Sequence, residues 1–189
     1  MIPAMIEFTP IGTSHADYAF VERLMTESFP PAERRTEADQ RQLTDHEERF
    51  SCLLITDGAL RVGFITLWRF PGFTYAEHLA TSPEVRNRGY GKQVMQRLAE
   101  YIPGLIVLEV EPPEDEMSRR RIGFYERCGF TLSPYEYLQP PYRPGGEPFP
   151  LRIMTAGSET FTHDRFVACR DLIYRHVYRY QPTGGGASF

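Results

Sequence analysis

A glycine-rich loop between a strand-like run and a helix places the tightest limit on how this chain can fold. Residues 77–81 read EHLAT, and after a short turn RNRGYG leads into GYGKQVMQRLAEYI at 89–102, whose apolar residues recur at helical spacing. Pro103 and Gly104 end that helix before LIVLEVE at 105–111, a nearly continuous apolar run that is typical of a buried parallel strand. This strand, helix and strand unit predicts an α/β fold.

Further strands and helices are predicted on both sides of this unit. An Asp-Gly pair at 57–58 indicates a hairpin, and the strand that follows the hairpin continues it as a meander. The other elements follow from apolar periodicity and from the proline and glycine residues between them. The expected strands are 5–11, 52–56, 60–68, 75–81, 105–111, 131–138 and 148–155, and the expected helices are 15–29, 37–50, 89–102, 118–128 and 163–180.

Length and composition favour one globular domain. The chain has 189 residues, of which 41% are hydrophobic and 24% are charged. We expect a single domain over 1–189 in which the glycine-rich segment 182–189 is a flexible tail. The formal net charge of −4 provides no general attraction for nucleic acid.

Cysteine usage and the N-terminal residues lead us to expect a cytoplasmic protein. The three cysteines are far apart and show no CxxC pattern, which argues against a disulfide framework and against structural zinc. The N-terminus lacks a basic region followed by an apolar run, and no run approaches the length of a bilayer span. We therefore expect a cytoplasmic protein without a metal and without a membrane partner.

The glycine-rich loop has the properties of an anion site. Backbone amides in the first turn of a helix lack helical acceptors and lie at the positive end of the helix dipole. Gly89 and Gly91 remove the side chains that would hold a phosphate away, and Arg86, Arg88 and Lys92 add positive charge. The loop therefore predicts a site for a pyrophosphate.

Two familiar phosphate loops do not fit this sequence. A P-loop requires Ser or Thr after its lysine, but Gln93 follows Lys92; a Rossmann fingerprint requires a third glycine where Val94 stands. An isolated Gly-x-Gly is also compatible with a flexible turn. The strand before the loop, and the helix GFYERCGF at 123–130 after the next strand, make a turn without function a weaker interpretation.

With these motifs the chain resembles the GNAT superfamily of acyl-CoA-dependent N-acetyltransferases. Its pyrophosphate loop has the form Q/R-x-x-G-x-G/A, which RNRGYG matches, and Tyr125, Gly129 and Phe130 match the fourth helix of the family. Ser118 stands where the family often has Asn, and Arg121 where it often has Ala. The resemblance implies a central mixed sheet of about six to seven strands, splayed between the fourth and fifth strands and flanked by helices.

The resemblance also implies where acetyl-CoA binds as co-substrate. Its pantetheine arm pairs with the backbone of a strand, much as an added strand does, and Ser118 can hydrogen-bond the cofactor. The amides implied for the pyrophosphate are those of Arg88, Gly89, Tyr90, Gly91 and Lys92, close to Asn87 and Arg86, and the residues implied for pantetheine are Leu79, Ala80 and Thr81.

N-acetylation requires a neutral amine, so a general base is useful, because an alkylamine of pKa ~10.4 is mostly protonated at neutral pH. Two carboxylates qualify by position: Glu109 in LEVE, and Glu77 on the neighbouring strand. The apolar neighbours of Glu109 are expected to raise its pKa by desolvation. Glu111 on the same face is the alternative base to Glu109. Glu77 could instead be an exposed strand residue without a catalytic role. A water could also relay the proton to either carboxylate.

The leaving thiolate gains from a proton donor, a role for which the resemblance implies Tyr125. The alternative is an aromatic residue of the core on an amphipathic helix. His78 is expected to point to the opposite side of its strand from Glu77 and to be structural. The expected partners are acetyl-CoA and an amine acceptor in a monomer or homodimer.

The acceptor itself is not defined by the sequence. Tyr135, Tyr137 and Tyr142 lie in a loop rich in proline that could line its pocket, or could form a rigid surface. A catalytically silent acyl-CoA-binding or regulatory module is the other function considered. Glu109 and Tyr125 beside the loop favour an enzyme, because a module that only binds needs RNRGYGK alone.

Overall fold

The sheet runs as an antiparallel meander through its first four strands and changes to parallel pairing between the fourth and the fifth. The computed structural model describes residues 5–157 and 160–181. Within these ranges eight strands form the sheet, in the order β1-β2-β3-β4-β5-β8-β6 with β7 paired to β8. The strands are β1 (Ile6–Pro10), β2 (Phe50–Asp57), β3 (Leu60–Phe70), β4 (Phe73–Thr81), β5 (Leu105–Val110), β6 (Thr131–Leu132), β7 (Tyr137–Gln139) and β8 (Phe149–Ala156).

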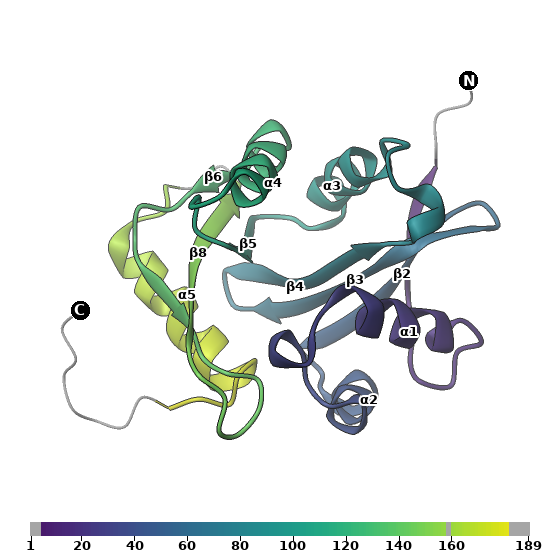
Figure 1. The fold of residues 1–189 in the computed structure, drawn as a ribbon, viewed down its shortest axis with the longest axis horizontal. Coiled ribbons are helices and arrows are strands. Elements are labelled where there is room, and N and C mark those ends of the chain that lie inside the picture. Colours follow the sequence, from purple (N-terminus) through teal and green to yellow (C-terminus); the bar gives the residue numbers. More distant parts are fainter. Residues whose placement is uncertain (1–4, 158–159, 182–189) are drawn as a thin grey trace.

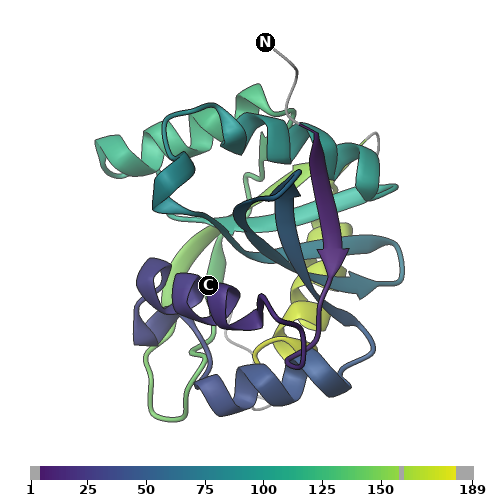
Figure 2. The ribbon, with the colours of Figure 1, turned by 90° about the vertical axis from the view of Figure 1, so that its right-hand side faces the viewer.

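Helices cover both faces of the sheet. Figure 1 shows helices packed against either face of the sheet, and Figure 2 shows the same layers after a turn of 90°. The core is accordingly divided in two: Val94 and Ile122 belong to one apolar cluster, and Leu24 and Ile173 to the other. None of the helices in the described ranges is long and apolar enough for a membrane span. The helices are α3 (Tyr90–Tyr101) and α4 (Glu116–Arg127) on the first face, and α1 (Tyr18–Ser28), α2 (Glu37–His46) and α5 (His163–His176) on the second, with 3-10 turns at Pro31–Glu33 and Pro83–Val85.

β4 and β5 pair over only part of their lengths. Their parallel register begins with Phe73 opposite Leu105 and ends with Ala76 opposite Leu108. β4 continues to Thr81, whereas β5 continues in pairing with β8 on its other edge. The splay between the fourth and fifth strands is therefore confirmed, and it opens at the carboxyl ends of both.

A β-bulge in β4 corrects the expected orientation of His78. Ile65 pairs with Leu79 and Leu67 with Ala76, so two residues of β4 oppose Thr66 alone. An extra residue of this kind interrupts the alternation of side chains along a strand. His78 consequently lies on the same side as Glu77, with its Nδ1 atom 3.7 Å from Oε2 of that carboxylate.

Three expected elements differ most from the structure, and the bounds of the others move by at most three residues. The segment 131–138 forms β6 and β7, both paired with β8, because Pro134 between them has no amide hydrogen for the ladder. The helix expected at 37–50 ends at His46. The last helix ends at His176 rather than at residue 180, and Arg179 takes a left-handed conformation with φ 52°. The tail expected at 182–189 lies outside the described residues.

Candidate active site

The loop between β4 and α3 has the backbone conformation of an anion site at a helix N-terminus. Gly89 is the N-cap residue of α3 and has φ 79°, a left-handed conformation that favours glycine. The glycine is exposed, and the first amides of α3 after it have no helical acceptor. A ligand anion can therefore approach these amides without meeting a side chain at the cap.

The second glycine and the tyrosine beside it hold the loop in place. A Cβ atom on Gly91 would lie 3.4 Å from Cζ of Phe124, so glycine here lets α3 approach α4 closely. The hydroxyl of Tyr90 donates a hydrogen bond of 2.8 Å to Oδ2 of Asp57, which ties the loop to the end of β2. Gly89 thus serves the turn and Gly91 serves the packing of the two helices.

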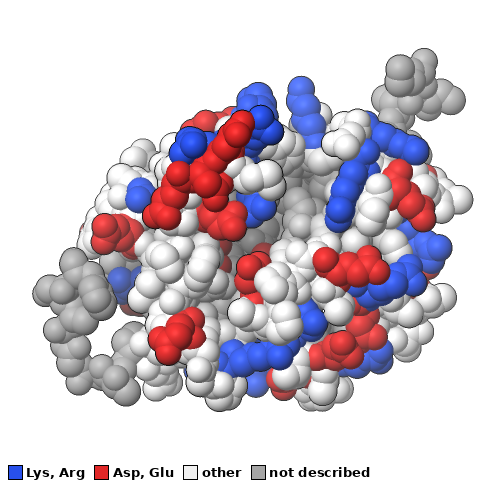
Figure 3. Space-filling view, in the orientation of Figure 1, with Lys and Arg blue, Asp and Glu red and all other residues white. Residues whose placement is uncertain are grey.

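Positive side chains surround this loop. Arg86, Arg88 and Lys92 are exposed, and no carboxylate in the described part of the chain forms an ion pair with any of them. The first turn of α3 contains no acidic residue. In Figure 3 Lys and Arg side chains gather over α3 and the loop before it. Charge and helix dipole therefore act in the same direction and favour an anion.

The edge of β4 beyond the splay is the second candidate surface. Leu79, Ala80 and Thr81 pair with β3 on one side and lie past the last residues that pair with β5 on the other. A strand edge of this kind can hydrogen-bond an extended ligand through its backbone. Figure 3 shows the surface hollowed between the half of the molecule that carries α4 and the half that carries α3.

Glu109 on β5 is a buried carboxyl group surrounded by tyrosine hydroxyls. Tyr178 donates a hydrogen bond of 2.7 Å to its Oε2 atom, and Tyr137 donates one to Oε1. Burial raises the pKa of Glu109 to about 7, although hydrogen bonds from Tyr137, Tyr178 and Tyr75 act in the opposite direction. At neutral pH this carboxyl group is poised between its two protonation states, which suits a general base.

Glu77 on β4 is also buried, but it has a cationic partner. The Nη1 atom of Arg35 lies 2.7 Å from its Oε1 atom, and the indole of Trp68 donates a hydrogen bond of 2.9 Å to Oε2. The hydroxyl of Tyr142 donates a further bond of 3.0 Å. Burial alone would raise the pKa of Glu77, but Arg35 and His78 hold it well below its usual range. Glu77 is therefore a fixed anion.

The chain resembles known proteins in sequence and in fold. Residues 18–130, more than half of the chain, match the family model described as Acetyltransferase (GNAT) family. The chain belongs to the GNAT family of acetyltransferases. A solved structure from Bacteroides thetaiotaomicron, described as an acetyltransferase of this family, is 43% identical over 93% of this chain and 99% of its own, with a TM-score of 0.90.

More distant structures share the GNAT fold alone. A chimera of the spermidine N-acetyltransferase SpeG from Vibrio cholerae with hSSAT is 15% identical, covers 80% of this chain and 94% of its own, and has a TM-score of 0.60. Arabidopsis thaliana NAA60 in complex with acetyl-CoA is 19% identical over 81% of this chain and 98% of its own, with a TM-score of 0.58. No curated protein matches the chain.

The tyrosine of the GNAT fourth helix is partly buried beside the helix end. The ring of Tyr125 lies 5.3 Å from that of Phe124 and 5.7 Å from that of Phe130, measured between centroids. Burial raises the pKa of its hydroxyl, although Arg121 acts to lower it. The hydroxyl therefore keeps its proton at neutral pH, as a proton donor must.

Ser118 and Glu111, two other residues singled out in this GNAT sequence, have local partners. Ser118 forms a capping box with Asp115, in which each backbone amide donates to the side chain of the other residue, at 2.7 and 3.2 Å. Glu111 lies 2.7 Å from Nη1 of Arg121 and is half exposed. In the described ranges, no group of three or more His, Cys, Asp or Glu residues could hold a metal.

Sequence reasoning missed most partners of the two carboxylates. Tyr137 and Tyr142 were candidates for an acceptor pocket, and each contacts a glutamate, whereas Tyr135 packs on α5 with a centroid distance of 5.1 Å to Phe166. The missed partners come from distant segments and read as ordinary core or loop residues. They are Arg35, Trp68, Tyr75 and Tyr178.

Proposed function

We propose that this GNAT protein, as a single domain, transfers an acetyl group from acetyl-CoA to a primary amine of a small molecule or peptide. The observation that carries the proposal is the buried carboxyl group of Glu109, whose pKa lies near 7 at the strand that diverges from β4. A buried carboxyl without a cationic partner destabilises the fold when ionised, so its position is best explained by catalysis.

The donor substrate fits the loop and the strand edge. The pyrophosphate would bind the amides of residues 88–92, with positive charge from Arg86, Arg88 and Lys92 and with Asn87 beside them. The pantetheine arm would lie along β4 at 79–81, where the strand edge is free of β5. We do not extend this role to Ser118, because its hydroxyl is engaged in the cap of α4.

Glu109 is the base in this proposal. It accepts a proton from the amine, whose nitrogen attacks the thioester carbonyl carbon as the carbon–sulfur bond breaks. Glu77 is the less suitable base, because Arg35 holds it ionised and a carboxylate of very low pKa is a weak proton acceptor. Its proposed role is structural.

Tyr125 completes the transfer as the proton donor. It gives its hydroxyl proton to the departing thiolate and regains a proton from solvent, while Glu109 releases its proton to solvent. In sum one proton passes from the nitrogen of the neutral amine to sulfur. Because the thiol has a pKa of ~8.5, protonation of the sulfur in the transition state assists its departure. Family membership together with Glu109 favours this enzyme over a catalytically silent module.

The test combines binding with turnover. Calorimetry should show that the protein binds acetyl-CoA, and a panel of polyamines, amino acids, aminoglycosides and short peptides should show thiol release with at least one class. Binding without thiol release from any amine would support the silent module. Absence of acetyl-CoA binding would refute the donor assignment itself.

A further inference from the structure

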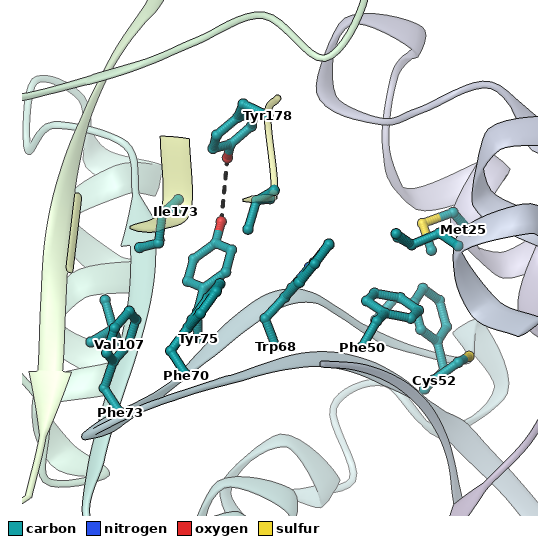
Figure 4. Packing of buried hydrophobic residues seen from close by; sticks show 14 of the residues in the cluster. Met25, Phe50, Cys52, Trp68, Phe70, Phe73, Tyr75, Val107, Ile173 and Tyr178 are labelled. Carbon is teal, nitrogen blue, oxygen red and sulfur yellow. Dashed lines mark hydrogen bonds between the residues drawn. The ribbon is translucent and has the colours of Figure 1, made fainter. Parts of the chain in front are cut away.

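Tyr178 reaches the carboxyl group of Glu109 from beyond the last helix, outside the segment that matches the GNAT family model. α5 ends at His176, and the amide of Tyr178 still donates to the carbonyl of Ile173 at 3.3 Å. Arg179 then turns the chain in a left-handed conformation. Figure 4 shows the ring of Tyr178 directed inward, with its hydroxyl facing that of Tyr75.

A second buried group fixes the direction of the hydrogen bond from Tyr178. The Nε2 atom of Gln139 on β7 donates to the Tyr178 hydroxyl oxygen at 2.8 Å. A tyrosine hydroxyl has one proton, and an amide nitrogen offers only donors. The Tyr178 hydroxyl oxygen thus accepts the hydrogen bond from Gln139. The hydroxyl proton is donated to Oε2 of Glu109, 2.7 Å away.

We infer that Tyr178 is a positioning residue for catalysis, which orients the Glu109 carboxylate and stabilises its ionised form. The inference rests on the proposed role of Glu109 as base. It makes the chain around Tyr178 a part of the active site, although Tyr178 lies 69 residues from Glu109 in the sequence. Gln139 supports the same arrangement from β7.

The effect of removing Tyr178 follows from all the groups that face Glu109. Tyr75 and Glu77 face it from β4, Tyr137 faces it from β7 and Tyr178 from the segment after α5. Tyr142 and Tyr174 are farther ionisable groups that its charge affects. The tyrosines that donate to the carboxylate lower its pKa, whereas burial and the charge of Glu77 raise it. Loss of one donor must therefore raise the pKa of Glu109.

The test compares Tyr178→Phe with Tyr180→Phe. Tyr180 is 41% exposed and lies in the same segment, so its variant controls for the loss of a hydroxyl. In Tyr178→Phe the acid limb of the kcat/KM profile should move upward by about one pH unit, as expected for one hydrogen bond to a charged group. Affinity for acetyl-CoA should not change, and Tyr180→Phe should keep the profile of the unmodified protein.

A readout independent of turnover separates this inference from the proposed function. Carbon-13 NMR of labelled glutamate carboxyl groups, with the Glu109 signal assigned by Glu109→Gln, should show the same upward shift in Tyr178→Phe. An unchanged titration of Glu109 in folded Tyr178→Phe would overturn the inference. If the titration shifts but Glu109→Gln keeps full activity, the assigned base is wrong. Tyr178 then sets the ionisation of Glu109 without a role in catalysis, which also overturns the inference.

Discussion

The Nη1 atom of Arg35 lies 2.7 Å from Oε1 of Glu77, and 8% and 0% of the two side chains are exposed. Arg35 also donates a hydrogen bond of 2.8 Å to the carbonyl oxygen of Val177, and its guanidinium carbon lies 5.0 Å from the ring centre of Tyr142. The pair therefore joins the segment before α2, the splayed strand β4 and the chain after α5, next to the proposed base.

Arg35→Leu should lower the free energy of unfolding by about 3–5 kcal/mol, because it leaves the charge of Glu77 buried without its partner. Urea unfolding followed by circular dichroism measures the change. The matched control is Arg41→Leu, which breaks an ion pair between Arg41 and Glu22 at the surface and should cost much less. Equal losses in the two variants would contradict a special role of the buried pair.

Gly89→Val should weaken acetyl-CoA binding at least about tenfold, because the left-handed backbone at Gly89 strains any β-branched residue and the side chain would cover the amides. Isothermal titration calorimetry measures the affinity. Gly145→Val is the control, since Gly145 has φ 78° and open space around it but lies in another loop. An unchanged affinity in Gly89→Val would sink the pyrophosphate assignment.

Tyr125→Phe should lower kcat by about 10²–10⁴-fold and leave acetyl-CoA affinity unchanged, since it removes only the proton donor. Steady-state kinetics and calorimetry on the same preparation measure both. Tyr101→Phe, in which another partly buried tyrosine that packs on Phe8 loses its hydroxyl, serves as control. If Tyr125→Phe keeps its kcat, the thiolate leaves unassisted or takes its proton from water.

Glu109→Gln should lower kcat/KM by about 10²–10⁴-fold and remove the acid limb of its pH profile. In the unmodified protein that limb should rise through about pH 7, because only the ionised carboxyl group accepts a proton. Glu111→Gln is the control, since Glu111 is half exposed and paired with Arg121. A limb that persists in Glu109→Gln would assign the base to another group.

The sequence allows prediction of the parts of the site that depend on local chain geometry. The loop 86–92, the helix after it and the splayed strands follow from glycine placement and from apolar runs that are adjacent in sequence. The bulge in β4 was not predictable in this way, because it depends on how Thr66 of β3 faces two residues of β4. The predicted orientation of the His78 side chain was therefore wrong.

The opposite pKa shifts of Glu77 and Glu109 could not be predicted from their neighbours in the sequence. Glu77 and Glu109 both lie in apolar strands, and only tertiary structure brings Arg35 to one and Tyr178 to the other. Tens of residues separate Arg35 from Glu77 and Tyr178 from Glu109 in the sequence. In addition, Tyr178 falls within the amphipathic helix expected at 163–180, where a tyrosine usually indicates a core position. The role of Pro134 in splitting a strand could be anticipated, because a proline within a strand removes a ladder hydrogen bond.

The free energy of unfolding should depend on the ionisation of Glu109 between about pH 4.5 and 7. Its pKa in the folded protein, about 7, is above the unfolded value of 4.5, so the unfolded chain releases this proton first as pH rises. The contribution of Glu109 to stability is therefore present at low pH and lost as pH rises toward 7. Glu77 does not contribute in this window, because its lowered pKa keeps it ionised throughout.

Glu109→Gln lacks this titration, so its unfolding free energy relative to that of the unmodified protein should rise with pH by up to about 3 kcal/mol. Urea titrations at pH 5 and pH 8 on both proteins measure it. Glu111→Gln, at a half-exposed position, should show no such trend. A difference between Glu109→Gln and the unmodified protein that is the same at both pH values would mean that Glu109 ionises normally in the fold, and the argument for it as a base poised at neutral pH would fail.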